Sequence, residues 1–275
     1  MKLDQASPIG VFDSGVGGLS ILKALQAQMP HEQFVYVADS SHAPYGERDA
    51  AFVQQRAAHL LQILREQHQV KALVVACNTA TALAIQNMRT AYPELPMFGV
   101  EPAIKPAAAM SHTKRVGVMA TPATLQSEKF QTLLSGLLSD AEFVLQACEG
   151  LADAIEQQWQ HADNSRVAMM CQKFVQAMGQ FGNQSGQIDT LVLGCTHYPF
   201  AMQELRALVG PDVQIVETGV PVARHTQSVL EERGLLSDAG EASVVLLATG
   251  DTQNLQHAAQ MWLQSTKALK VQPLV

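Results

Sequence analysis

The chain has 275 residues, of which 47% are hydrophobic and 16% are charged, and its formal net charge is −7. This composition is typical of a folded, core-forming protein and argues against a disordered chain. The acidic balance, without any stripe of Lys and Arg, argues against a nucleic-acid-binding protein. The sequence has no apolar stretch of roughly 18 residues and no apolar signal-peptide region near its start. We therefore expect a soluble, cytoplasmic protein that binds neither membranes nor nucleic acid.

Short apolar runs alternate with amphipathic segments along almost the entire chain. The apolar runs predict strands at residues 9–13, 34–38, 72–76, 96–100, 115–120, 142–147, 190–194, 213–217 and 243–248. Between them, a helical period is clear at residues 50–67 and 165–181. Because the strands are apolar on both faces and alternate with helices, we expect an α/β fold with mainly parallel sheets.

Two pairs of segments are similar to each other within the chain. IGVFDSGVGGL (9–19) has the same pattern as VGVMATPATLQ (116–126), and LVVACNTA (73–80) has the same pattern as LVLGCTHY (191–198). This repetition predicts two similar α/β lobes, related by a pseudo-twofold axis and facing each other across an active-site cleft. We expect residues 1–98 plus 212–275 to form the first lobe, which carries Cys77. Residues 99–211 then form the second lobe, which carries Cys195.

The segment DSGVGG (13–18) is an incomplete phosphate-binding motif, because serine at position 20 breaks the G-x-G-x-x-G frame. It still predicts a strand, a tight turn and a helix N-terminus, whose amides can bind an anion. Asp13 and Ser14 lie at this turn. Each is a candidate for ligand binding or, alternatively, for a simple helix N-cap.

Two of the four cysteines occur in matched surroundings. Cys77 and Cys195 each follow an apolar strand and precede a predicted helix, whose dipole lowers the pKa of a thiol. The residues that follow them offer amide, hydroxyl and imidazole groups: Asn78, Thr79, Thr196 and His197. For a single cysteine, a buried core position is the main alternative, but the matched pair favours acid/base chemistry. A zinc site at Cys195 and His197 does not fit the required spacing and number of ligands, so no metal is predicted.

Other candidates carry weaker signals. Cys148 and Cys171 lack polar neighbours of this kind and are interpreted as core residues. In the Pro/Gly loop at 39–48, Tyr45 and Gly46 could contact a ligand or form an ordinary turn that packs its tyrosine. Glu156, taken alone, is interpreted as a solvated helix residue.

Five motifs together resemble the glutamate racemase family: DSGVGG, PYG (44–46), ACNTA (76–80), LGCTHYP (193–199) and TGD (249–251). They occur in order over nearly the whole chain. The resemblance implies a cofactor-independent isomerase with one catalytic cysteine in each of two α/β lobes. Such an enzyme interconverts L- and D-glutamate by proton transfer at Cα and supplies D-glutamate for peptidoglycan synthesis. It implies glutamate as the small-molecule partner and leaves the oligomeric state open, with a homodimer as one alternative.

The resemblance also implies roles for individual residues. Cys77 and Cys195 match the acid/base pair, with Asp13 and His197 as assisting groups. Glu156 matches a further assisting glutamate, although the run CEGLADAIE lacks the prolines that are usual there. The matching substrate-binding positions are Asp13, Ser14, Tyr45, Gly46, Asn78, Thr79, Thr196 and His197.

Three alternatives are open at this point. An aspartate or hydantoin racemase would use the same chemistry, but aspartate racemases usually carry Glu where this chain has His197. A related decarboxylase would need one cysteine, whereas this chain has both Cys77 and Cys195. A binding protein that has lost catalysis belongs to a different class, and the intact cysteines argue against it. An activity assay distinguishes it from an enzyme.

Overall fold

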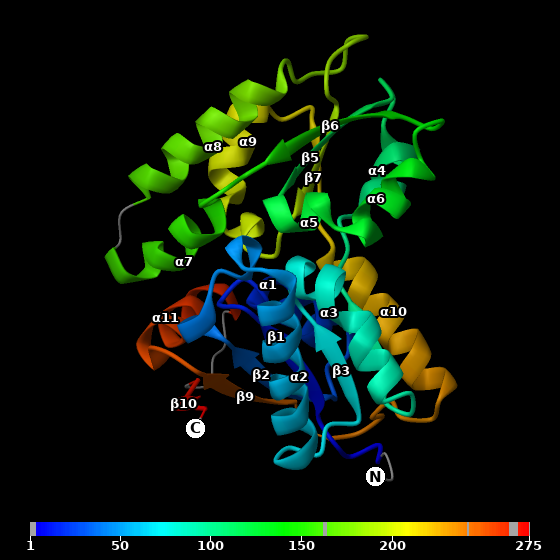
Figure 1. The fold of residues 1–275 in the computed structure, drawn as a ribbon, viewed down its shortest axis with the longest axis vertical. Coiled ribbons are helices and arrows are strands. Elements are labelled where there is room, and N and C mark those ends of the chain that lie inside the picture. Colours follow the sequence, from blue (N-terminus) through cyan, green and yellow to red (C-terminus); the bar gives the residue numbers. More distant parts are fainter. Residues whose placement is uncertain (1–3, 162–163, 241, 264–268, 275) are drawn as a thin grey trace. The chain divides into compact units, whose positions relative to one another are not determined.

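The computed structural model describes residues 4–161, 164–240, 242–263 and 269–274. The chain divides into two compact units, Met1–Val100 with Gly219–Val275, and Glu101–Thr218. Each unit contains a sheet of parallel strands covered by helices (Figure 1). This confirms the predicted α/β class with two mainly parallel sheets.

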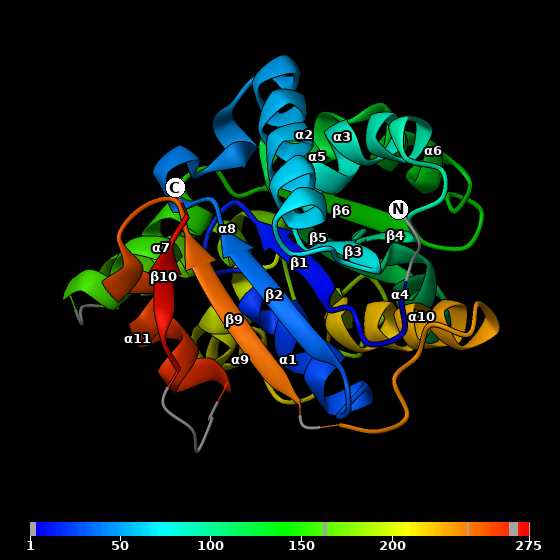
Figure 2. The same ribbon diagram turned by 90° about the horizontal axis from the view of Figure 1, so that it is seen from below.

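The first unit is built on a sheet with the strand order β10-β9-β2-β1-β3-β4, in which all neighbouring strands are parallel. Its strands are β1 (Ile9–Asp13), β2 (Gln33–Ala38), β3 (Ala72–Val75), β4 (Met97–Gly99), β9 (Ser243–Ala248) and β10 (Val271–Pro273). One face is covered by α2 (Ala50–Glu66) and α3 (Asn78–Ala91). The other face is covered by α1 (Leu19–Gln28), α10 (Gly219–Glu232) and α11 (Thr252–Leu263), as Figure 2 shows.

The core of the first unit explains why its central strands consist almost entirely of apolar residues. Every residue of β1 and β3 is buried, because helices cover both faces of the sheet. Successive side chains of a strand point to opposite faces, so Phe12 and Val75 pack on the side of α2 and α3. Cys77 and Tyr45 belong to the same core cluster. The candidate site of this unit is therefore attached directly to the core.

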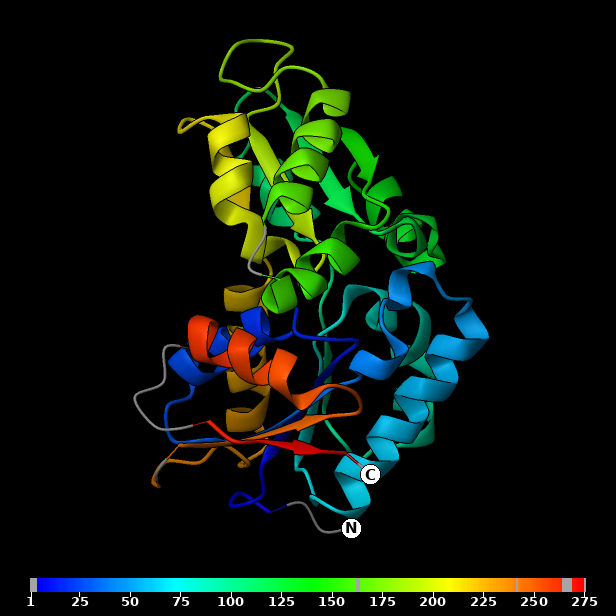
Figure 3. The same ribbon diagram turned by 90° about the vertical axis from the view of Figure 1, so that its left-hand side faces the viewer.

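One strand of the first sheet was not predicted from the sequence. The short β10 pairs with β9 at the edge of the sheet and contacts α11 (Figure 3). Its three residues, Val-Gln-Pro, are partly or fully exposed. A short edge strand of this kind lacks the continuous apolar run by which the other strands were recognised.

The second unit has a sheet with the strand order β6-β5-β7-β8, again parallel throughout. Its strands are β5 (Arg115–Ala120), β6 (Glu142–Ala147), β7 (Thr190–Gly194) and β8 (Gln214–Val216). Helices α7 (Leu151–His161), α8 (Ser165–Met178) and α9 (Met202–Val209) pack on one face. Helices α4 (Ile104–Met110), α5 (Pro122–Gln126) and α6 (Glu128–Ser135) pack on the other. Because β8 pairs with β7, the second unit extends beyond the expected boundary at residue 211.

The two sheets share a strand order. The arrangement β2-β1-β3-β4 in the first sheet matches β6-β5-β7-β8 in the second, so β3 and β7 occupy equivalent positions. The carboxyl ends of parallel strands lie at one edge of a sheet, which is where α/β proteins place their functional groups. Cys77 follows β3 and Cys195 follows β7, so each unit carries a cysteine at the equivalent place.

Candidate active site

Cys77 lies at the junction between β3 and α3. It is the N-cap residue of α3, and only 6% of it is exposed. Its Sγ atom is 4.0 Å from the Oγ atom of Ser14. The amino end of a helix carries a partial positive charge, which favours an anionic group such as a thiolate. The strand end, the helix start and Ser14 thus define the surroundings of this thiol.

Asp13 is the last residue of β1 and is completely buried. Its Oδ1 atom accepts hydrogen bonds from the backbone amide of Gly15 at 2.8 Å and from the Ser14 hydroxyl at 3.2 Å. Asp13 therefore shapes the turn after β1 and also holds Ser14, which lies next to the thiol of Cys77. A capping role and a role in the site are both compatible with this geometry.

Asn78 and Thr79 form the first turn of α3 and are both buried. The Nδ2 atom of Asn78 donates to the carbonyl of Val100 at 3.3 Å. Its Oδ1 atom is buried and has no hydrogen-bond partner within the described part of the chain. Leaving a buried acceptor unsatisfied costs about 1–3 kcal/mol, so a donor on a bound ligand would stabilise this arrangement.

Tyr45 and Gly46 lie in the 3-10 turn η2 (Tyr45–Glu47). The side chain of Tyr45 is completely buried, and its hydroxyl donates to Oδ2 of Asp39 at 2.5 Å. Gly46 is partly exposed. Of the two groups, it is thus the Gly46 backbone rather than the tyrosine ring that remains accessible to a ligand.

Cys195 follows β7, and 8% of it is exposed. The strand ends on Gly194, where a Cβ atom would lie 2.9 Å from both the Cβ of Ala120 and the carbonyl of Met119. The expectation that a helix begins directly after Cys195 is wrong, because a turn separates it from the 3-10 helix η3 (Tyr198–Ala201). His197 lies in this turn, and its Nδ1 atom is 3.8 Å from Sγ of Cys195. An imidazole, rather than a helix terminus, is therefore the group beside this thiol.

Glu156 and His197 form a buried pair. The Nε2 atom of His197 is 2.8 Å from Oε2 of Glu156, which lies on α7. Only 5% of His197 and 9% of Glu156 are exposed, so the interpretation of Glu156 as a solvated helix residue is wrong. The glutamate faces inward because α7 packs against η3. An imidazole between a carboxylate and a thiol can take up and return a proton, as in general acid/base catalysis. Thr196, between Cys195 and His197, is buried as well.

The other two cysteines are core residues, as the sequence predicted. Cys148 and Cys171 are almost completely buried in the second unit. Burial raises the pKa of the Cys171 thiol to about 12 and raises that of Cys148 well above its ordinary value. Both therefore remain neutral thiols near pH 7. Within the described residues, no group of three or more His, Cys, Asp or Glu side chains is arranged to hold a metal ion.

The structure brings the candidate residues together in two groups. Within the first unit, Asp13, Ser14, Cys77, Asn78 and Thr79 lie at neighbouring strand ends and helix starts. Within the second unit, Glu156, Cys195, Thr196 and His197 lie around the end of β7.

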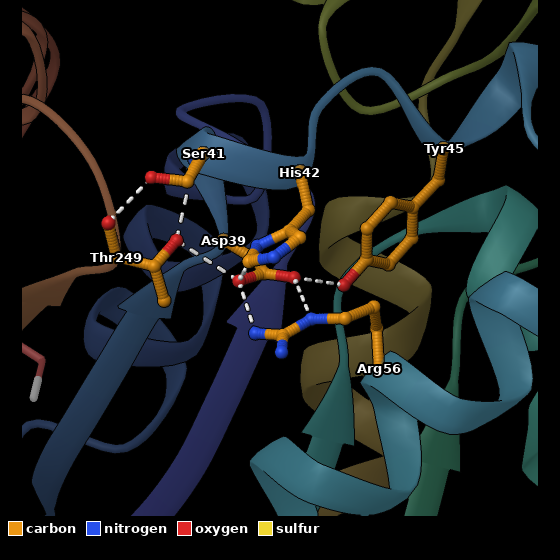
Figure 4. Close-up of polar contacts among 6 residues, drawn as sticks. All are labelled: Asp39, Ser41, His42, Tyr45, Arg56 and Thr249. Atoms are coloured by element: carbon orange, nitrogen blue, oxygen red, sulfur yellow. Dashed lines mark hydrogen bonds and ion pairs between the residues drawn. The ribbon is translucent and has the colours of Figure 1, made fainter.

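Three residues of the first unit were not recognised from the sequence. Asp39 accepts the hydrogen bond of the Tyr45 hydroxyl, and Arg56 and Thr249 bind the same carboxylate (Figure 4). Thr249 belongs to the TGD motif, which contributed to the family resemblance but did not indicate that Thr249 contacts Asp39. Arg56 gave none, because it is one of several polar residues on an amphipathic helix.

Comparison with known proteins identifies the class of protein to which this fold belongs. The family model for Asp/Glu/Hydantoin racemase matches residues 19–232. A curated glutamate racemase from Pseudomonas entomophila is 43% identical over 265 residues, which cover 96% of this chain and 97% of that protein.

Solved structures agree with this result. The crystal structure of a glutamate racemase isoform from Bacillus anthracis has a TM-score of 0.86 and 30% identity, with 98% of each chain covered. A glutamate racemase from Francisella tularensis, solved in complex with D-glutamate, has a TM-score of 0.82 and 26% identity, again with 98% of each chain covered. The chain therefore belongs to the Asp/Glu/hydantoin racemase family and is a racemase, which is an isomerase. This confirms the resemblance that the sequence motifs indicated.

Proposed function

We propose that this racemase interconverts L- and D-glutamate and that Cys77 and Cys195 transfer the proton at Cα. The observation that carries the proposal is the equivalence of β3 and β7, each of which leads to a cysteine with a polar partner. Glutamate as substrate is supported by the similarity to glutamate racemases over nearly the full length of the chain.

The paired thiols fit the chemistry of racemisation. Inverting Cα requires a base on one face of the substrate and an acid on the other, and their roles exchange when the reaction reverses. A thiol has an unperturbed pKa of about 8.5, close enough to the working pH to serve in either role. We propose that Cys77 takes the proton from D-glutamate and that Cys195 takes it from L-glutamate. Each thiol then acts on one face of the same substrate.

The neighbouring residues would assist the thiols in different ways. Asp13 would act near Cys77 through the Ser14 hydroxyl, which it holds at 3.2 Å. His197 would exchange a proton with Cys195, and Glu156 would fix the tautomer of His197 and stabilise its protonated form. Unlike Glu156, both Asp13 and His197 also match substrate-binding positions.

Substrate binding would use donors and acceptors at the starts of helices and turns. We propose that Ser14, Asn78, Thr79 and Thr196, with the backbone at Tyr45 and Gly46, hold the substrate. Because no cofactor withdraws electrons in this proposal, such groups must stabilise the carbanion that develops at Cα. The buried Oδ1 atom of Asn78 is a suitable acceptor for the ammonium group of an amino acid.

The cellular role follows from the reaction. D-glutamate is the product that the resemblance links to peptidoglycan synthesis, and we propose that the enzyme supplies it in the cytoplasm. Among the residues that the structure describes, no helix is long and apolar enough to cross a membrane. We propose a homodimer as one alternative for the oligomeric state, and light scattering would measure whether it forms.

A substrate panel tests the proposed specificity. After exhaustive treatment with a chelator and without added cofactor, the enzyme is expected to racemise both enantiomers of glutamate faster than those of aspartate. His197 motivates this expectation, since it occupies the place where aspartate racemases usually carry a glutamate. Chiral chromatography of the products, with hydantoins included in the panel, measures the rates. Faster turnover of aspartate or of a hydantoin would contradict glutamate as the substrate.

A further inference from the structure

Asp39 is a buried carboxylate that lies beside the candidate site but has no role in the proton transfer described above. It directly follows β2, whose neighbours are β1 and β9. Asp13 pairs in register with Ala38, and the backbone amide of Asp39 donates to the carbonyl of Asp13 at 2.9 Å. The side chain of Asp39 is completely inaccessible to solvent. Burying a charged carboxylate is costly unless other groups pair with it, so the residues that contact Asp39 indicate what it does.

The carboxylate of Asp39 accepts hydrogen bonds from four other side chains (Figure 4). Arg56 on α2 binds both oxygens, with its Nε at 3.0 Å and an Nη at 2.8 Å. Tyr45 donates to Oδ2 at 2.5 Å, and Thr249 donates to Oδ1 at 2.9 Å. The Nδ1 atom of His42 is 3.0 Å from Oδ1. We call these five residues, Asp39, His42, Tyr45, Arg56 and Thr249, the Asp39 network.

The charge of Asp39 is stable in these surroundings. Burial acts to raise its pKa, but the hydrogen bonds from Arg56, Tyr45 and Thr249, together with the positive charge of Arg56, outweigh it, so the pKa lies below its ordinary value. For Tyr45, burial raises the pKa far above its ordinary value, and the negative charge of Asp39 and its hydrogen bond to the hydroxyl add to this effect. The phenol therefore remains protonated and donates to a permanent anion. Hydrogen bonds to charged groups are stronger than those between neutral groups.

The Asp39 network fixes the orientation of Tyr45. The ring of Tyr45 packs edge-on against Phe52, with 6.5 Å between the ring centroids, while its hydroxyl is held by Asp39. A ring that is anchored at both ends cannot reach out to a ligand. What it does fix is the backbone from Tyr45 to Gly46, and Gly46 is the partly exposed member of this turn.

The TGD motif joins the same network from a distant part of the chain. Besides its bond to Asp39, Thr249 accepts a hydrogen bond at its carbonyl from the hydroxyl of Ser41 at 2.5 Å. The next residue, Gly250, approaches the 40–41 backbone so closely that a Cβ atom there would lie 3.1 Å from the amide nitrogen of Ser41. The threonine and the glycine of the motif thus attach the turn after β9 to the loop that contains Tyr45.

We propose that Asp39 is a positioning residue, which holds the Tyr45–Gly46 turn in its substrate-binding conformation with the help of Arg56 and Thr249. This inference rests on the proposed function, in which that turn contacts glutamate. The turn contacts the substrate in the same way before and during proton transfer, so loosening it weakens binding without changing the chemical step. When a mutation weakens binding of the substrate and of the transition state equally, KM rises and kcat stays nearly unchanged. This effect is the same for both enantiomers.

Two conservative variants test the inference. Asp39→Asn removes the charge but keeps the shape, and Tyr45→Phe removes only the hydroxyl. Each is expected to raise KM for L- and for D-glutamate about tenfold, the effect of losing one hydrogen bond to a charged group, while kcat changes by less than about threefold. The double variant is expected to resemble the more severe single variant, because both changes break the same hydrogen bond. Hydrogen exchange of the backbone amides at 40–48 should become about tenfold faster in each variant.

Glu32→Gln is the matched control. Glu32 precedes β2 as Asp39 follows it, is equally buried, and lies 2.7 Å from Nζ of Lys71. This variant should lower the melting temperature but leave KM and the exchange of residues 40–48 unchanged. A lower kcat with unchanged KM in the Asp39 and Tyr45 variants would overturn the inference. An equal rise in KM in Glu32→Gln would also overturn it, because Asp39 would then act only as a stabilising residue. Faster exchange without a change in KM would overturn it as well. If the unmodified enzyme did not racemise glutamate at all, the proposed function would fail, while the exchange data would still report whether Asp39 holds the turn.

Discussion

Replacing either Cys77 or Cys195 with alanine is expected to abolish racemisation, with kcat falling by at least about a thousandfold, within the range that acid/base groups contribute. The reason is that each variant leaves one face of Cα without a proton donor or acceptor. The remaining thiol can still remove the proton from one enantiomer, but it can only return it to the same face. The double variant should therefore be no less active than the single ones. Chiral chromatography after long incubation measures the residual rate.

Cys171→Ala is the matched control for these variants. It deletes the same sulfur from a buried position, but burial raises the pKa of Cys171 to about 12, and the residue lies in the core of the second unit. It should lower the melting temperature slightly and leave kcat unchanged. Near-normal racemisation by either Cys77→Ala or Cys195→Ala would contradict the paired-thiol account. If Cys171→Ala lost activity as well, the losses in Cys77→Ala and Cys195→Ala would be explained by disturbed packing rather than by missing thiols.

The assisting pair in the second unit gives the next largest expected effect. His197→Asn and Glu156→Gln should each lower kcat about a hundredfold in the more strongly affected reaction direction, the lower end of what general acid/base groups contribute. His197 lies 3.8 Å from the thiol of Cys195, and Glu156 lies 2.8 Å from the far nitrogen of His197. Because Glu156 acts through the imidazole, the double variant should lose no more than His197→Asn alone. Asp13→Asn is the corresponding change beside Cys77.

The two reaction directions should respond unequally to these variants. The enantiomers have equal free energy, so the two values of kcat/KM must remain equal to each other. The asymmetry therefore appears in kcat and KM separately, and in opposite directions for His197→Asn and Asp13→Asn. Initial rates from pure L- and pure D-glutamate measure it. Asp153→Asn is a control for Glu156→Gln, because Asp153 lies on the same helix, α7, pairs with Arg166 and is partly exposed. Negligible effects of His197→Asn and Asp13→Asn would assign both residues to packing or capping.

The sequence predicted the strands well, because parallel strands buried on both faces appear as continuous apolar runs. β1, β5, β6, β7 and β9 begin and end where the sequence placed them. The short exposed β10 has no such run and was missed. The boundary between the units was also placed too early, because the pairing of β8 with β7 depends on contacts that periodicity does not reveal.

The candidate site could be proposed from the sequence where its residues are adjacent in the chain. Cys77 with Asn78 and Thr79, and Cys195 with Thr196 and His197, are contiguous and lie at strand ends. Glu156 was different, since its helix pattern alone indicated an exposed residue and only the family resemblance assigned it a role. Its contact with His197 joins residues 41 positions apart.

The Asp39 network shows what sequence reasoning could not reach. Asp39 contacts Arg56 across 17 positions and Thr249 across 210. Nothing in the local sequence distinguishes Arg56 from the other polar residues of its helix. The register of β2 with β9 brings Asp39 beside Thr249, and the packing of α2 on the sheet brings Arg56 to the same place.

The labelling of glutamate in heavy water tests the two-thiol mechanism most directly. Starting from L-glutamate, the first turnovers should place deuterium at Cα of the D product, while the recovered L-glutamate remains largely unlabelled. The acid on the far face carries a hydrogen from solvent, whereas the abstracting thiol returns its own proton whenever the carbanion reverts. Starting from D-glutamate, the pattern should be reversed. Mass spectrometry of the separated enantiomers at low conversion gives the result. A D product that retains the original hydrogen, or equal labelling of both enantiomers, would show a single base serving both faces and would contradict the assignment of Cys77 and Cys195 as an acid/base pair.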